Sequence, residues 1–122
     1  MKKVHFLSIN VDKNIAEIRH ILKTEGSLKA KIYFYNKVKP RGDWDYKRIY
    51  GLSLGEDIGN FNYGATGRIA GFRLNQLLRA GGLVSELVGT YSSNYGHFYG
   101  NFPYGDDPRD QHAIMSGYYY AK

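Results

Sequence analysis

The chain has 122 residues and no cysteine, which allows one hydrophobic core and excludes disulfides, thiol nucleophiles and cysteine-ligated zinc sites. Its net charge is +6, with 17 Lys and Arg against 11 Asp and Glu, so polyanions and acidic proteins are favoured partners. Apolar runs are only a few residues long and no apolar signal core follows Met1. We therefore expect no membrane span, and we expect a larger carrier protein to export the chain.

Two helices are predicted in the first third of the chain. Apolar residues recur with helical spacing in the first one, at Val11, Ile15, Ile18 and Leu22. Asn10 or Asp12 is the expected cap at its start, and Gly26 is expected to end it. Ser27 then has the chemistry of an N-cap for a second helix that runs to about Val38. Residues 32–35 also have high β-propensity, so a strand is the alternative to the second helix at these positions.

A Pro-Gly break at residues 40–42 precedes the only tryptophan, which two carboxylates flank. Asp43 or Asp45 can act as an acid or a base at a site edge, with Trp44 as a stacking platform and Lys47 as a cation for the substrate. The alternative is that Trp44 fills the core while its neighbours face water. Residues 49–58 are expected to form an irregular connection.

Residues 59–67 combine three glycines with two asparagines, a tyrosine and a threonine. Glycine allows backbone N–H groups to approach a ligand closely, while Asn60, Asn62 and Tyr63 supply neutral hydrogen-bonding groups. We predict a ligand-binding loop here. The alternative is a plain turn that starts a helix at Ala65.

A short helix is expected at residues 68–72, and a longer one with a broad apolar stripe at residues 74–88. Residues 90–104 have no regular period and form a long predicted loop, of the kind that is often functional. His97 in this loop is the leading candidate for a catalytic group, because imidazole titrates near neutral pH. Tyr95 and Tyr99 offer stacking faces. A structural, hydrogen-bonded role for His97 remains the alternative.

The last predicted helix starts after Asp107 and runs to about Tyr120. Asp107 is the expected N-cap, Pro108 the first helical residue and Asp110 the capping-box carboxylate. A metal site is the minor alternative, and its ligands would be Asp106, Asp107, Asp110 and His112. The prediction is that the chain uses no metal and no cofactor.

Three blocks of sequence resemble the polymorphic toxin type 44 family. They are Gly-Asp-Trp-Asp-Tyr-Lys at 42–47, Gly-Asn-Phe-Asn-Tyr-Gly-Ala-Thr-Gly-Arg at 59–68 with Gly71 and Phe72, and Tyr-Gly-Asp-Asp-Pro-Arg-Asp-Gln at 104–111 with Ile114 and Gly117. The resemblance implies a mostly α-helical ribonuclease toxin, carried at the end of a secreted Rhs-type or VgrG-type protein and neutralised by an immunity protein. Many members have His where this chain has Asn62, which argues against an obligatory histidine at that position.

The resulting fold prediction is a compact, mostly α bundle of about four to five helices. Residues 1–122 are expected to form this single toxin domain, with long Gly-, Asn- and Tyr-rich loops forming the site. An acidic immunity protein is the expected partner.

Three functions are compatible with the sequence. The first is a metal-independent ribonuclease acting in the target cytoplasm, with His97, Asp43, Asp45 and Tyr63 as catalytic candidates. Its substrate-binding candidates are Asn60, Asn62, Trp44, Lys47, Arg68, Tyr95 and Tyr99. The second is a periplasmic peptidoglycan hydrolase that uses Asp43 or Asp45 with Glu56 and Asp57, since paired carboxylates catalyse glycoside hydrolysis. The third is a carbohydrate- or nucleic-acid-binding module without enzymatic activity.

Overall fold

The computed structural model describes residues 2–87 and 95–122, with side-chain surroundings at 11–48, 50–51, 54–82 and 95–122. Within these ranges the chain forms six α-helices and no β-strand, which confirms the mostly α prediction. The helices are α1 (Lys2–Glu25), α2 (Ser27–Val38), α3 (Tyr46–Tyr50), α4 (Leu52–Ile69), α5 (Leu74–Leu87) and α6 (Pro108–Tyr120).

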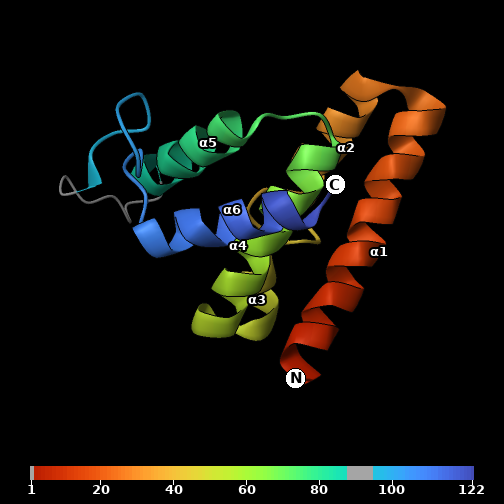
Figure 1. Ribbon diagram of the computed structural model, residues 1–122, viewed down its shortest axis with the longest axis horizontal. Helices are drawn as coiled ribbons and strands as arrows, with labels where there is room; N and C mark the ends of the chain where they lie inside the picture. Colours follow the sequence, from red (N-terminus) through yellow and green to blue (C-terminus); the bar gives the residue numbers. More distant parts are fainter. Residues whose placement is uncertain (1, 88–94) are drawn as a thin grey trace.

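Helix α4 lies at the centre of the molecule, with α6 crossing it and α1 and α2 forming a hairpin beside it (Figure 1). Glycines allow the backbones of α4 and α6 to approach each other closely where the two helices cross. A Cβ added at Gly64 would overlap the carbonyl oxygen of Ile114, and one added at Gly117 would overlap the carbonyl oxygen of Phe61. The two backbones are therefore in direct contact, which only glycine permits at these positions.

The main core lies between α4 and its neighbours. Ile18 of α1, Ile58 of α4 and Ile114 of α6 are fully buried within it. Burial of one such side chain contributes about 1.5–3 kcal/mol. A smaller cluster joins α1 to α4 and to the residue after α6, through Val11, Ile15, Ala65 and Ala121.

Several predicted elements agree with the structure. Helix α2 forms instead of the competing strand, α5 spans nearly all of the predicted 74–88 segment, and Gly26 separates α1 from α2 with φ 93°. The side chain of Asp107 caps α6 by accepting a hydrogen bond from the Arg109 backbone N–H at 2.9 Å.

Other elements correct the predictions. Helix α1 begins at Lys2 rather than at Asn10 or Asp12, and no separate helix forms at 68–72 because α4 ends at Ile69. The predicted connection at 49–58 is mostly helical, since Gly51 alone separates α3 from α4. The predicted loop at 59–67 is the middle of α4, so its backbone N–H groups are used in helix hydrogen bonds rather than presented to a ligand.

The predicted loop at 90–104 lies partly outside the described residues. Its described part, from Tyr95 onward, contains turns and bends before α6. Arg79 of α5 holds it by donating hydrogen bonds to the carbonyl oxygens of Phe98 at 3.0 Å and Gly100 at 2.9 Å. Separately, none of the helices in the described ranges is both long and apolar enough to cross a membrane.

Candidate functional site

A cleft of about 1260 Å³ opens between the end of α2, the following turn, α3, α5 and the first turns of α4 and α6. Its charged lining residues are Lys39, Asp45, Lys47, Glu56, Asp106, Asp107 and Asp110. Five carboxyl groups thus face two ammonium groups. The cleft is locally acidic although the whole chain carries a net charge of +6.

Asp110 and Glu56 form a carboxyl pair in this cleft. Burial raises the pKa of Asp110 to about 8, and a hydrogen bond to Glu56 and the negative charges of Asp106, Glu56 and Asp107 act in the same direction. A carboxyl group with that pKa keeps its proton at pH 7. The pair therefore places a neutral carboxylic acid beside a carboxylate, which is the state that a general acid needs.

Asp106 explains why Asp110 is available for this pairing. Asp106 is buried, and its Oδ1 accepts a hydrogen bond from the Asp107 backbone N–H at 2.9 Å. Its Oδ2 accepts another from Gln111 Nε2, also at 2.9 Å. The Asp107 N–H is the group that a capping-box Asp110 would have bound. The predicted capping-box role of Asp110 is thus wrong, and Asp110 contacts Glu56 instead.

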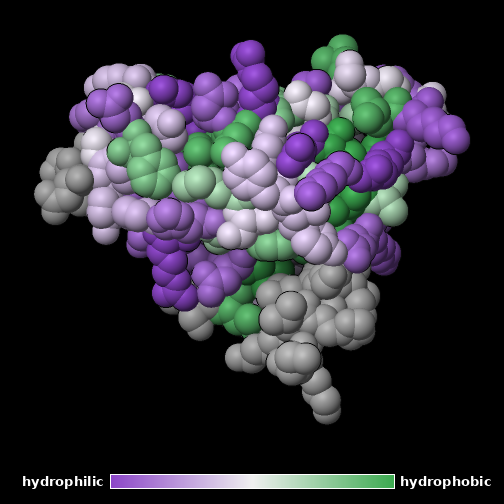
Figure 2. Space-filling model, in the orientation of Figure 1, coloured by the Kyte–Doolittle hydropathy of each residue, from purple (hydrophilic) through white to green (hydrophobic). Residues whose placement is uncertain are grey.

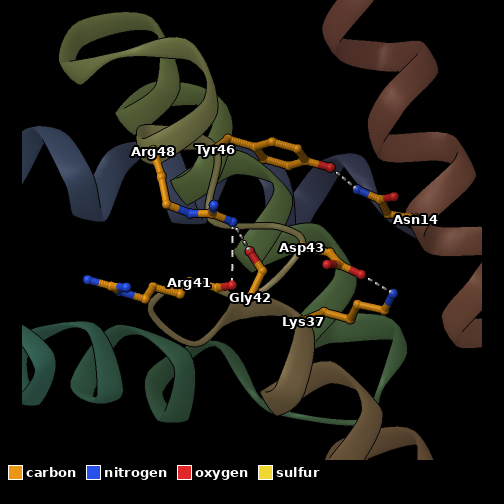
Figure 3. A network of polar contacts seen from close by, with 7 residues as sticks. All are labelled: Asn14, Lys37, Arg41, Gly42, Asp43, Tyr46 and Arg48. Carbon is orange, nitrogen blue, oxygen red and sulfur yellow. Dashed lines mark hydrogen bonds and ion pairs between the residues drawn. The ribbon is translucent and has the colours of Figure 1, made fainter.

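The turn after α2 separates the two predicted catalytic aspartates. Asp43 points to Lys37 and forms a 2.8 Å ion pair with it (Figure 3). This hydrogen bond lowers the pKa of the Asp43 carboxyl and raises the pKa of Lys37. Asp43 is highly exposed and does not line the cleft, whereas Asp45 does. Asp45 accepts a hydrogen bond from the Arg41 backbone N–H at 2.9 Å, which fixes its carboxylate.

Trp44 and Tyr46 line the cleft mainly as parts of its wall. Trp44 is buried and packs edge-on against Tyr33, with 6.4 Å between ring centroids. Trp44 therefore fills the core at the cleft's edge, as the alternative prediction stated for it, although Asp45 beside it lines the cleft. The Tyr46 hydroxyl accepts a hydrogen bond from Asn14 of α1 at 2.6 Å, and burial raises the pKa of Tyr46 (Figure 3).

Helix α4 divides its predicted site residues between two faces. Asn60 and Tyr63 line the cleft. The Tyr63 hydroxyl donates a 2.7 Å hydrogen bond to the Leu77 carbonyl oxygen, and burial raises its pKa, so the phenol stays protonated. Asn62 is fully buried and does not line the cleft; its Oδ1 accepts a hydrogen bond from Asn14 Nδ2 at 2.9 Å.

The remaining predicted residues fall on both sides of the cleft boundary. Lys47 and Tyr95 line it, whereas Arg68, His97 and Tyr99 do not. His97 is exposed and stacks on Tyr99, with 5.0 Å between ring centroids. Arg68 donates a hydrogen bond to the Tyr118 carbonyl oxygen at 2.9 Å. The structure thus brings Asp45, Tyr63 and Tyr95 together and leaves His97 outside.

Three other carboxyl residues complete the comparison with the sequence. Asp57, which the hydrolase hypothesis included, lies outside the cleft and pairs with Arg109 at 3.1 Å. The sequence predicted Asp110 as a capping residue, and Asp106 and Asp110 as ligands of the alternative metal site, rather than as groups for proton transfer. The sequence contained a signal for a functional role here. Residues 106–110 include three aspartates, and one helix cap needs fewer than three. Among the described residues, no cluster of three or more His, Asp or Glu side chains is arranged to hold a metal ion.

The comparisons with known proteins identify the family. The family model for bacterial toxin 44 matches residues 19–122, which includes the whole cleft lining and all three sequence blocks. Searches of curated proteins and of solved structures gave no match. Because the family model covers most of the chain, the predicted resemblance is confirmed, and this chain belongs to the bacterial toxin 44 family.

Proposed function

We propose that the cleft is the active site of a hydrolase that cuts the glycan of the bacterial cell wall. The observation that carries this proposal is the Asp110–Glu56 pair in the cleft lining, where burial raises the pKa of Asp110 to about 8. Cleavage of a glycosidic bond needs such an acid to protonate the leaving oxygen, and a second carboxylate to act as nucleophile or to activate water.

Asp110 is the proposed general acid, and Glu56 is the charged neighbour that helps to keep its proton. In glycosidases the acid and the opposing carboxylate stand about 5–9.5 Å apart. Two hydrogen-bonded carboxyl groups are closer than that, so the pair acts as one acid unit. The opposing carboxylate is then Asp45 or Asp107, both of which line the cleft.

The cleft also has the size and lining for a sugar chain. Its volume of about 1260 Å³ exceeds the 300–1,000 Å³ of typical small-molecule sites. Aromatic rings and side-chain amides line it together, namely Tyr35, Tyr63, Phe72, Tyr95, Asn60 and Gln76. Rings that pack on the faces of sugars, beside amides that bind hydroxyl groups, suit an uncharged polyol better than a phosphate chain.

A ribonuclease remains the second candidate, supported by the net charge of +6 and by the activity that the sequence resemblance implies. The charge of the cleft counts against it. RNA phosphates need cations, and the five lining carboxyl groups outnumber the two lining lysines. Of the residues predicted for that chemistry, Asp45 and Lys47 line the cleft, whereas His97 and Arg68 do not. A binding module without enzymatic activity would leave the protonated Asp110 without a role.

Family membership makes this chain a bacterial toxin domain. In our proposal residues 1–122 act as a single domain, a carrier protein delivers it, and it kills from the periplasm. An acidic immunity protein protects the producing cell, and its acidity suits the net charge of +6.

Incubation of the purified chain with peptidoglycan and, separately, with RNA tests the proposal. We expect new reducing ends from peptidoglycan, and a loss of about 10²–10⁴-fold in Asp110→Asn and in Glu56→Gln. Asp57→Asn is the matched control, because Asp57 follows Glu56 directly yet lies outside the cleft. Cleavage of RNA that survives Asp110→Asn, with intact peptidoglycan, would overturn the proposal in favour of the ribonuclease.

A further inference from the structure

Helix α2 carries an exposed apolar stripe that the proposed reaction does not use. Leu28, Ile32 and Tyr35 are 71%, 48% and 64% exposed and follow the i, i+4, i+7 spacing of one helix face. We name these three residues the α2 stripe. The other face of the same helix buries Ala30 and Phe34 in the core, so α2 is held in place while the stripe faces outward.

The surroundings of the α2 stripe are positively charged. Residues 26–42 contain five basic residues and no Asp or Glu. Two of these lysines make contacts within the chain. Lys31 Nζ lies 5.4 Å from the centre of the Phe72 ring, and Lys37 forms an ion pair with Asp43. Lys29 and Lys39 are exposed beside the stripe. In Figure 2, hydrophobic and hydrophilic surfaces alternate over the end of the molecule where Figure 1 places α1 and α2.

The stripe is continuous with the cleft. Tyr35 belongs to the stripe and also lines the cleft, and Lys39, one turn further along the chain, lines the cleft as well. Leu28 and Ile32 do not line it. A macromolecule seated along the whole stripe would therefore reach the rim of the cleft at Tyr35 and hinder access of a polymeric substrate.

We propose that the α2 stripe is the docking surface for the acidic immunity protein, and that this partner inhibits the toxin by covering the cleft rim. Apolar side chains of the partner would pack on Leu28 and Ile32, while its carboxylates would pair with Lys29 and Lys39. A central apolar contact with a charged rim is the usual organisation of a specific protein interface. The complementary charges speed association.

A membrane surface is the competing occupant of a basic helix with an apolar face. The geometry favours a protein. A helix that binds a bilayer inserts a broad apolar face to a depth of about 5–10 Å. Here the broader apolar face of α2 is already packed into the core, and only a stripe one residue wide remains exposed.

The tests are calorimetric titration, for affinity, and stopped-flow mixing, for association rate, of the chain with its cognate immunity protein. We expect the Leu28→Ser/Ile32→Ser double variant to bind at least tenfold more weakly. Lys39→Glu should lower the association rate and reduce its dependence on salt. Tyr119→Ser is the matched control, because Tyr119 is an exposed aromatic residue on α6 and we expect unchanged affinity for that variant. Since the stripe is exposed, all variants should keep the melting temperature of the parent chain within a few degrees.

Unchanged affinity in the double variant would overturn the proposal. A parallel titration with vesicles containing anionic phospholipid identifies the competing occupant: stripe-dependent binding to vesicles without stripe-dependent binding to the immunity protein would assign the stripe to a membrane. Affinity is measured without substrate, so this result does not depend on whether the cleft cuts glycan or RNA.

Discussion

Asp110 of α6 and Glu56 of α4 both line the cleft, and their interaction helps to raise the pKa of Asp110, although 54 positions separate them in the sequence. The α4–α6 crossing makes this contact, because Gly64 and Gly117 allow the two helix backbones to touch. The same close packing that stabilises the fold therefore also aligns the proposed acid with its partner.

The first prediction concerns stability as a function of pH. The pKa of Asp110 is about 8 in the folded chain, against about 4 for an unfolded aspartate. Between these values the folded state binds more protons than the unfolded state, so this group lowers the free energy of unfolding as pH rises from 4 to 8. We expect the melting temperature of the parent chain to fall over that interval and that of Asp110→Asn to fall less. Parallel curves for the two proteins would show that Asp110 has no raised pKa.

The second prediction concerns the pH dependence of hydrolysis. Activity should fall on the alkaline side near pH 8, where Asp110 loses its proton. Asp106→Asn removes a negative charge that raises the pKa of Asp110, so the alkaline limb should move to lower pH. Its substituted side chain keeps an oxygen for the Asp107 N–H. A pH–rate profile measures the shift, and carboxyl NMR titration of Asp110 checks it without substrate. If the alkaline limb of the pH–rate profile does not move in this variant, Asp106 does not influence the proton transfer.

The sequence predicted the fold class, α2, α5 and α6, because apolar spacing and capping chemistry are local signals. It failed at residues 59–67, where the glycines were interpreted as loop residues. Their role is tertiary, because Gly64 makes room for the α6 backbone, and no local pattern reveals a partner 50 residues away. A helical signal was nevertheless present: Ile58, Asn62, Ala65 and Ile69 follow the spacing of one helix face. The polar Asn62 concealed it.

The third prediction uses two glycines of α4 as a pair. A Cβ at Gly64 would overlap the backbone of Ile114, whereas a Cβ at Gly59 would meet no atom within 4 Å. Gly64→Ala must therefore force α6 away from α4, and we expect a loss of about 2–4 kcal/mol in the free energy of unfolding. Gly59→Ala should instead stabilise the chain by about 0.4–1 kcal/mol, since alanine favours the helix. Urea denaturation measures both values, and equal effects at the two positions would contradict the α4–α6 contact.

The fourth prediction concerns Asn62, which the sequence placed among the substrate-binding residues. Its side chain is fully buried, and no partner for its Nδ2 is found among the described residues. Asn62→Ala removes the acceptor for Asn14 and should destabilise the chain by about 1–3 kcal/mol. The KM for peptidoglycan should stay unchanged at a temperature where the variant is folded. A raised KM with unchanged stability would instead show that Asn62 contributes to substrate binding.

The last prediction separates the two enzymatic hypotheses at His97. This residue lies outside the cleft and stacks on Tyr99, and Arg79 holds the surrounding loop by donating hydrogen bonds to the carbonyl oxygens of Phe98 and Gly100. If the cleft performs the reaction, His97→Ala should keep at least half of the parent activity and its pH profile. Asp110→Asn, measured in the same assay, should lose nearly all of it. A ribonuclease centred on His97 predicts the opposite result. His97→Ala would then lose nearly all activity because the general base is removed, and Asp110→Asn would keep it because Asp110 takes no part in the reaction. Toxicity on expression in the cytoplasm and in the periplasm gives an independent readout, since a cell-wall hydrolase kills only where its polymer is.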